Sequence, residues 1–174
     1  MANWNPPADL TYAAKRDVLA AYFHEYGFTR VVETGLYNGQ GSSYQFIGQA
    51  TVVVCDLRQE WCDQASREGV SLAVCGDTRD TFEGVLRFLN GPALFWLDSH
   101  LVVEAEEEND SPLESELAAI LPWEHAARSV VLIDDVRMMG RPGWPVVEDV
   151  VLMCEPVWDF VVSEDIVRCT PRES

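Results

Sequence analysis

The stretch Val31-Val32-Glu33-Thr34-Gly35-Leu36-Tyr37-Asn38-Gly39-Gln40-Gly41-Ser42-Ser43 decides the fold of this chain of 174 residues. Two β-branched residues lead into an acid, three glycines follow within seven positions, and two serines close the stretch. This order is typical of a strand that ends, a backbone that turns tightly against a ligand, and a helix that begins. The Ser42 and Ser43 hydroxyls are suited to cap that helix, whose free N–H groups would face the same ligand.

Hydrophobic runs and helix-stop residues predict a regular alternation of strands and helices. An amphipathic helix over 9–26 comes first, and an antiparallel hairpin with its turn at 163–165 comes last. Between them we expect strands over 30–34, 51–56, 70–75, 93–98 and 129–135, and helices over 42–49, 60–68, 79–90, 112–121 and 145–154.

Continuous apolar strands that alternate with helices indicate an α/β fold with both faces of the sheet covered. The fold class predicted is a doubly wound, mostly parallel Rossmann-like sheet with a C-terminal antiparallel hairpin. We expect a single domain over 1–174, made of an N-terminal helical segment over 1–29 and a Rossmann-like core over 30–170.

The composition excludes several classes of partner. Twenty-nine acidic residues against twelve lysines and arginines give a net charge of −17. Because such a charge repels phosphate backbones and anionic lipid, we expect neither nucleic acid nor a membrane as partner. The N-terminus lacks the pattern of a signal peptide, and no apolar run is long enough to span a bilayer, so a cytoplasmic protein is expected.

The five cysteines show no C-x-x-C spacing, so zinc and thioredoxin-like chemistry are unsupported. Cys55 and Cys75 lie inside apolar runs and are expected to be small core residues.

Every expected parallel strand ends in an acid, and open parallel sheets bind ligands at that edge. These acids are Glu33, Asp56, Asp77, Asp98 and the pair Asp134–Asp135. Asp56 is placed to accept from both hydroxyls of a ribose. Asp77 either accepts from an adenine amino group or caps the following helix. Glu33 lies under the glycine loop (Gly35–Gly41), where it meets an ammonium group or a loop N–H.

The glycine spacing argues against a dinucleotide. Gly35-x-x-x-Gly39-x-Gly41 departs from the G-x-G-x-x-G pattern, and an acidic edge repels a pyrophosphate more than a neutral or cationic ligand. A nicotinamide dehydrogenase is therefore the weaker hypothesis.

Several short motifs, taken in order, resemble those of class I S-adenosylmethionine-dependent methyltransferases: Glu33-Thr34-Gly35 with Gly39, the acid Asp56, Gly76-Asp77 and the terminal hairpin. Later segments resemble the metal-dependent, macrocin-type small-molecule O-methyltransferases, namely Leu97-Asp98-Ser99-His100, Pro112-Leu113-Glu114-Ser115-Glu116-Leu117 and Leu132-Ile133-Asp134-Asp135-Val136-Arg137. The resemblance spans residues 29 to 170.

The resemblance implies roles for individual residues in binding S-adenosylmethionine. Glu33, Gly35 and Gly39 would hold the methionine part, Asp56 the ribose, and Asp77 the adenine end. Ser43, at the start of the helix after the glycine loop, is a further candidate for cofactor binding.

Asp98 and the pair Asp134–Asp135 end the fourth and fifth strands, which are neighbours in this topology. Since neighbouring strands lie about 4.8 Å apart, these carboxylates can share one cation. Hard oxygen ligands favour Mg²⁺ or Mn²⁺, which would lower the pKa of a bound substrate hydroxyl. In the alternative, adjacent strand residues point oppositely, and one of the two aspartates only caps the turn at 136–140.

His100 follows Asp98 by two residues and is a candidate base for the hydroxyl proton, because an unperturbed histidine titrates at about 6.5. Asp98 is the second candidate, and a surface or structural histidine is the alternative. Candidates for lining the substrate pocket are Trp144, Trp158, Trp123 and Trp96, and a buried core position is the favoured alternative for Trp96. The acidic run over 104–110 is either a solvated loop, or a lid or extra metal contact at the ligand edge.

The sequence thus predicts an S-adenosylmethionine-dependent methyltransferase that methylates a small-molecule hydroxyl with the help of a divalent metal. The alternatives are a metal-dependent hydrolase and a non-catalytic S-adenosylmethionine-binding module on the same fold. Only about 29 residues precede the first strand. We therefore expect either a second copy in a homo-oligomer that completes the acceptor pocket, or an open groove.

Overall fold

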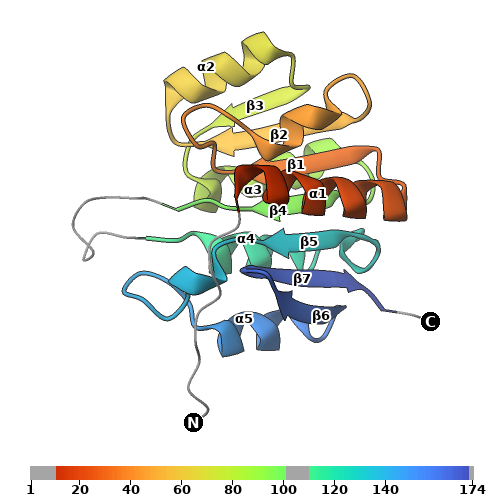
Figure 1. Cartoon of the computed structure of the whole chain (residues 1–174), viewed down its shortest axis with the longest axis vertical. Coiled ribbons are helices and arrows are strands. Elements are labelled where there is room, and N and C mark those ends of the chain that lie inside the picture. The colour runs from red at the N-terminus through yellow and green to blue at the C-terminus, as the bar shows by residue number, and fades with distance from the viewer. Residues whose placement is uncertain (1–10, 101–109, 173–174) are drawn as a thin grey trace.

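A seven-stranded sheet in the order β3-β2-β1-β4-β5-β7-β6 runs through the computed structural model, which describes residues 11–100 and 110–172 (Figure 1). Neighbouring strands among β1 to β5 pair in parallel, whereas β7 is antiparallel to both β5 and β6. The strands are β1 (Arg30–Thr34), β2 (Thr51–Asp56), β3 (Leu72–Cys75), β4 (Leu94–Leu97), β5 (Val130–Ile133), β6 (Trp158–Ser163) and β7 (Ile166–Pro171). The predicted fold class is confirmed.

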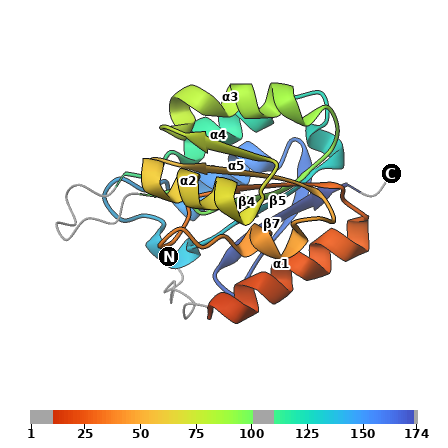
Figure 2. The same ribbon diagram turned by 90° about the horizontal axis from the view of Figure 1, so that it is seen from above.

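Helices cover both faces of the sheet (Figure 2). On one face lie α1 (Tyr12–Tyr26), the 3-10 helix η1 (Ser42–Phe46) and α2 (Gln59–Glu68), and on the other lie α3 (Thr78–Leu89), α4 (Leu113–Ile120) and α5 (Val147–Cys154). Successive strand residues point to opposite faces, so each apolar strand supplies both cores. For example, Trp96 packs in the core under α1, and Phe95 packs in the core under α3. Among the described residues, no helix has both the length and the apolar character needed to cross a bilayer.

The helix predicted over 42–49 is wrong in kind. The segment makes only the short 3-10 helix η1, and Gly48 then turns the chain with φ +82° toward the start of β2 at Thr51. The other predicted helices are confirmed with small shifts at their ends. Hydrogen bonds from Ser42 and Ser43 to the buried Glu33 hold the start of this segment and override its helical propensity.

The prediction that Cys55 and Cys75 are both core residues is half right. Cys55 is fully buried in the middle of the sheet, whereas Cys75 is exposed. Cys75 is the last residue of β3, and β3 lies at the edge of the sheet.

The register of the sheet brings the strand-end acids together at one edge. Leu97 pairs with Thr34 on one side and with Ile133 on the other, so Asp98 and Asp134 leave neighbouring strands at the same level. Backbone bonds continue the ladder past the strand ends, because Asp98 N–H donates to Thr34 O at 3.1 Å and Asp134 N–H donates to Leu97 O at 3.0 Å. The predicted adjacency of the fourth and fifth strands is confirmed.

Candidate functional site

Glu33 holds the glycine loop in place from beneath. Its carboxylate is 2% exposed and accepts bonds from Ser42 N–H at 2.7 Å, from Ser43 N–H at 2.9 Å and from Ser43 Oγ at 2.6 Å. Of the two roles predicted for Glu33, the structure shows the loop N–H one. Burial raises the pKa of Glu33 to about 7, although the hydrogen bonds from Ser43 and Ser42 favour its charged form.

The serines do not cap a helix as predicted. Gly41 is the residue before η1, and no side chain caps this short helix. The Ser43 hydroxyl instead donates to Glu33, and Ser43 is fully buried. Ser43, predicted as a cofactor-binding residue, therefore lies behind the loop and supports it.

The protein's own contacts explain why two loop positions are glycine. Gly35 has φ +81°, and a Cβ there would lie 2.3 Å from the carbonyl oxygen of Asp98. Gly39 has φ +71°, and a Cβ there would lie 2.5 Å from Oε1 of Gln64 in α2. A side chain at either position would also strain the left-handed backbone. The loop is thus pressed against β4 on one side and α2 on the other.

Asp56 joins the end of β2 to the glycine loop. Its Oδ2 accepts from Leu36 N–H at 2.7 Å, and its Oδ1 accepts from Arg58 N–H at 2.7 Å. Burial raises the pKa of Asp56, although these two backbone N–H groups oppose the shift. Each carboxylate oxygen can accept more than one hydrogen bond, so the two oxygens keep acceptor capacity for a pair of hydroxyls.

Asp77 caps α3, which is the alternative that the sequence left open. Its Oδ1 accepts from Arg79 N–H at 2.9 Å, and its Oδ2 lies 3.6 Å from the Arg79 guanidinium, which also pairs with Asp110. The rest of the acidic run over 104–110 lies outside the described residues.

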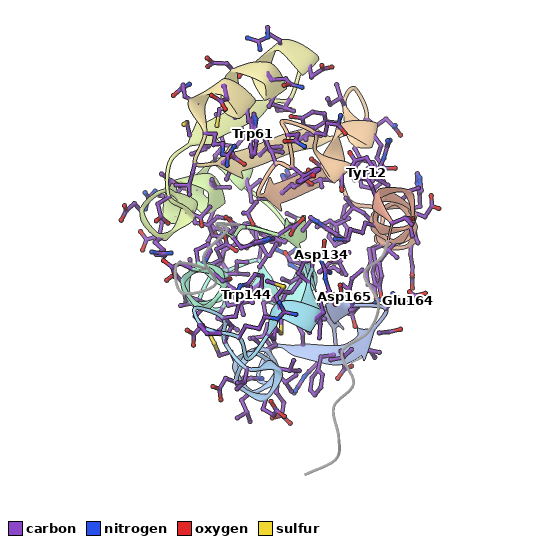
Figure 3. All side chains as sticks on the ribbon, turned by 60° about the vertical axis from the view of Figure 1, so that its left-hand side comes forward. Tyr12, Trp61, Asp134, Trp144, Glu164 and Asp165 are labelled. Atoms are coloured by element: carbon purple, nitrogen blue, oxygen red, sulfur yellow. The ribbon has the colours of Figure 1, made fainter. Side chains whose placement is uncertain are left out.

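At the ends of β4 and β5, a lysine from α1 meets the paired aspartates. Nζ of Lys15 lies 2.6 Å from Oδ2 of Asp134 and 3.2 Å from Oδ1 of Asp135. Asp134 is 1% exposed and Asp135 is 4% exposed. In Figure 3, Asp134 lies near the middle of the molecule with Trp144 to one side of it. Lys15 was not predicted as a site residue, because a lysine near the start of an amphipathic helix gives no local signal of a buried role.

Arg137 and Asp165 extend this cluster toward the terminal hairpin, where Figure 3 labels Asp165 and its neighbour Glu164. The Arg137 guanidinium donates to Asp135 Oδ1 at 2.6 Å and pairs with the fully buried carboxylate of Asp165. Arg137 N–H also donates to Asp165 Oδ1 at 2.7 Å. Asp165 reaches this place because Glu164 and Asp165, at the tip of the hairpin, have φ of +53° and +65°. Neither Arg137 nor Asp165 was predicted as a site residue.

Asp134 and Asp135 both reach Lys15, although adjacent strand residues point oppositely. The reason is that β5 ends at Ile133 and the backbone turns at Asp135, where φ is +62°. The Asp135 side chain makes no capping bond to the short helix η4 (Val136–Met138), and Asp134 Oδ1 accepts from Asp135 N–H at 2.8 Å. The capping alternative for the side chain of Asp135 is therefore wrong.

His100 lies between two of these carboxylates. Its Nδ1 is 3.7 Å from Oδ1 of Asp98, its Nε2 is 3.7 Å from Oδ2 of Asp135, and its ring centroid is 5.1 Å from that of Trp144. Burial lowers the pKa of His100, although Asp135 opposes the shift, so the imidazole is neutral at pH 7. The surface alternative for His100 is wrong, because its side chain is only 14% exposed.

The pKa of Asp98 is raised well above its ordinary value, first by burial and then by the charges of Asp134 and Asp135. The pKa of Asp134 is raised to about 6 by burial and by Asp135, while Lys15 opposes the shift. The predicted group of Asp98, Asp134 and Asp135 is therefore brought together, but cations from the chain already contact two of its members.

Glu116 is a further buried acid, and it was not predicted as a site residue. It comes from α4, is 1% exposed, and accepts a hydrogen bond from Thr34 Oγ1 at 3.4 Å. Burial raises the pKa of Glu116 to about 7, although the hydrogen bond from Thr34 opposes the shift.

A shallow hollow of about 450 Å³ lies away from this cluster, between the C-terminal parts of α3 and α4. Leu86, Arg87, Ala119, Trp123 and His125 are among its lining residues. Because these helices run antiparallel to the strands, the hollow lies at the opposite edge of the sheet from the acids.

The strand order and the antiparallel seventh strand make a Rossmann-like α/β fold that this chain shares with solved structures of methyltransferases. An O-methyltransferase from Bacillus cereus in complex with S-adenosylhomocysteine shares this fold with a TM-score of 0.60 and 14% identity, over 95% of this chain and 84% of that one. The N-methyltransferase NodS from Bradyrhizobium japonicum shares it with a TM-score of 0.56 and 12% identity, over 92% and 96% of the two chains.

A TehB-like methyltransferase from Corynebacterium glutamicum has a TM-score of 0.52 and 16% identity, over 92% of this chain and 96% of that one. No family model and no curated protein sequence matches the chain. The comparisons thus establish the fold, and the chemistry has to be argued from the residues.

We predict opposite effects for two glycine substitutions. Gly35→Ala should lower the free energy of unfolding by about 2 kcal/mol or more, because it places a side chain in a left-handed backbone and against a backbone carbonyl. Gly84→Ala, inside α3 with nothing within 4 Å of the added Cβ, should raise it by about 0.5–1 kcal/mol. Urea denaturation measures both, and equal effects would contradict the tight approach of the loop to β4.

We predict that Glu33→Gln destabilises the protein by about 1–3 kcal/mol, because an amide NH₂ would face N–H and O–H donors of the loop. The matched variant is Glu116→Gln, which replaces an equally buried acid. Urea denaturation gives the free energy of unfolding of both variants. If Glu33→Gln lowers it by no more than Glu116→Gln does, the anchoring role of Glu33 is contradicted.

The same Glu116→Gln variant should change how stability depends on pH. The folded-state pKa of Glu116 is raised from 4.5 to about 7, so its contribution is full below pH 4.5 and is lost as the pH rises through about 7. Gln does not titrate. Stability of the variant relative to wild type should therefore rise between pH 5 and pH 7, by up to about 3 kcal/mol. Urea denaturation across this range tests it, and a constant difference would contradict the shift.

Proposed function

We propose that the chain is an S-adenosylmethionine-dependent methyltransferase that acts on a small-molecule hydroxyl. The observation that carries this proposal is the pairing of two centres along one edge of the sheet. The glycine loop, anchored by Glu33 and Asp56, lies at the ends of β1 and β2. A neutral histidine between two carboxylates lies at the ends of β4 and β5.

The groups at the glycine loop and Asp56 suit a ligand made of a nucleoside joined to an amino acid. The two oxygens of Asp56 have acceptor capacity for the two ribose hydroxyls, and the backbone from Gly35 to Gly39 offers room for the amino-acid part. Asp77 remains the candidate for the adenine end. We assign Glu33 to holding the loop rather than to contacting the ligand. When bound, S-adenosylmethionine supplies a methyl group on a positively charged sulfur, which an acidic site favours.

We assign proton removal to His100. Because its imidazole is neutral, it can accept the proton of an acceptor hydroxyl. Asp98 and Asp135 each lie 3.7 Å from one ring nitrogen, and the charge of Asp135 would stabilise the protonated form of the ring. Trp144 packs against the ring and limits its rotation. Holding the hydroxyl in line with the methyl group is the main contribution of the site to the rate.

A base beside the acceptor favours oxygen over nitrogen as the methylated atom. A hydroxyl becomes a good nucleophile when its proton is removed, whereas a neutral amine already has a free electron pair. The presence of His100 thus supports O-methylation, although the fold is shared with enzymes of both types.

The metal assistance predicted from the sequence does not fit the carboxylates. Lys15 contacts both Asp134 and Asp135, and Arg137 contacts Asp135, so two of the three carboxylates expected to bind Mg²⁺ or Mn²⁺ are already paired with cations. Ligand atoms of Asp98, His100 and Asp135 also lie within 4.8 Å of one another, but the raised pKa of Asp98 favours its neutral form, which is a poor ligand for a hard cation. The proposed reaction therefore includes no metal. A metal-dependent hydrolase loses its main support for the same reason.

We predict that Asp56→Asn weakens binding of S-adenosylhomocysteine by about 10- to 100-fold, because one charge-assisted acceptor is lost. Asp80→Asn removes the same charge from an exposed position in α3 and should leave the Kd unchanged. Isothermal titration calorimetry measures both. Unchanged binding in Asp56→Asn would refute the ribose assignment, and no binding to wild type would refute the proposed function.

We predict that His100→Gln lowers kcat by about 10²- to 10⁴-fold and leaves S-adenosylhomocysteine binding intact. A protonated imidazole cannot accept the proton of the acceptor hydroxyl. Wild-type kcat should therefore fall at pH values below the pKa of His100, which is lowered from 6.5. This acid limb should vanish in the variant. Transfer of labelled methyl from S-adenosylmethionine to a panel of phenols and sugars gives the rates.

His24→Gln, on the exposed side of α1, is the matched control and should behave like wild type. Binding of the cofactor without transfer to any hydroxyl compound would support the non-catalytic module instead.

A further inference from the structure

Lys15 is the only lysine in the chain, whose other eleven basic residues are all arginines. It lies one helical turn before Leu19 and two before Phe23, on the same face of α1. Both of these residues are buried in the core that contains Trp96 and Leu132. The packing of α1 on the sheet therefore sets Lys15 over the carboxyl ends of β4 and β5, with its side chain 14% exposed.

The ammonium group of Lys15 is held by two buried carboxylates at once. Its Nζ is 2.6 Å from Oδ2 of Asp134 and 3.2 Å from Oδ1 of Asp135. Lys15 and Asp135 are 120 positions apart in the sequence. Burial works to lower the pKa of Lys15, but Asp134, Asp135 and Asp98 raise it above the ordinary value. Lys15 is thus a permanent cation and not a base.

The carboxylates around Lys15 have the spacing of a metal site. Ligand oxygens of Asp134, Asp135 and Asp165 all lie within 4.8 Å of one another. Three buried negative charges at such distances repel one another strongly unless cations neutralise them. Lys15 and Arg137 supply two positive charges from within the chain. Lysine suits the inner position because its ammonium is a compact point charge, as a metal ion is.

A divalent ion between Asp134 and Asp135 would have to displace this ammonium. The other oxygen of Asp134 already accepts the Asp135 N–H at 2.8 Å. The remaining oxygen of Asp135 faces His100, at 3.7 Å. The position that a divalent ion would take between the two aspartates is therefore the position of the Lys15 ammonium.

We propose that the Lys15 ammonium replaces a divalent cation between Asp134 and Asp135, and that removing it turns the pair into a divalent-cation site. The inference rests on the proposed function only for its catalytic consequence, which is methyl transfer that EDTA does not inhibit. The cation exchange itself concerns the folded chain and needs neither cofactor nor acceptor.

Mn²⁺ binding to the full chain, followed by electron paramagnetic resonance and calorimetry, tests the exchange. Wild type should bind no stoichiometric Mn²⁺, and Lys15→Met should bind one ion at least about tenfold more tightly than wild type. Asp134→Asn in the Lys15→Met background should remove that site. Arg16→Met makes the same charge change one residue away and should behave like wild type.

Stoichiometric Mn²⁺ binding to wild type as tight as to Lys15→Met would overturn the proposal, and so would a folded Lys15→Met protein that binds none. Calorimetry with S-adenosylhomocysteine on wild type separates this failure from a failure of the proposed function.

A second measurement needs only the wild-type protein, in case Lys15→Met does not fold. Reductive methylation with formaldehyde and cyanoborohydride can modify only one side-chain amine, because the chain has one lysine. Lys15 should stay protected in millimolar Mg²⁺ or Mn²⁺ while the terminal amine reacts. Release of Lys15 to the reagent by either ion would overturn the proposal.

Discussion

The rest of the site depends on the hydrogen bonds that the buried carboxylate of Glu33 accepts. By accepting the N–H groups of Ser42 and Ser43, it fixes the glycine loop and the short helix η1 that follows. Phe46, at the end of η1, stacks on Phe23 of α1 with ring centroids 4.2 Å apart. The position of α1 in turn sets Lys15 over the ends of β4 and β5. One acid under a loop is therefore linked, through two packing steps, to the far half of the site.

The two halves of the acidic edge use their carboxylates differently. At β1 and β2, Glu33 and Asp56 accept backbone N–H groups and so shape a loop that can receive a ligand. At β4 and β5, Asp134 and Asp135 accept charged side chains instead. The carboxylates at β1 and β2 therefore position the backbone of the loop. Those at β4 and β5 have their buried negative charge neutralised by side chains of the chain itself. The neutral imidazole of His100 lies beside the second group, where the surrounding carboxylates can stabilise the proton it receives.

The features that the sequence predicted are those set by local pattern. Apolar runs marked the strands, and the acid after each run marked the ligand edge, because strand ends are read directly from the chain. The cations escaped prediction because their contacts are remote: Lys15 and Asp135 lie 120 positions apart, and Arg137 meets Asp165 across 28 positions. Helical propensity after the glycine loop misled the prediction of 42–49, since Glu33 and Gly48 override it there.

A crystal structure of the chain grown with S-adenosylhomocysteine and Mg²⁺ tests the central claim most directly, because it locates the ligand and the cation together. The account predicts ribose hydroxyls on Asp56, the amino-acid part along Gly35–Gly39, and the Lys15 ammonium still between Asp134 and Asp135. A ligand bound away from the glycine loop, or a magnesium ion between the two aspartates with Lys15 displaced, would contradict it.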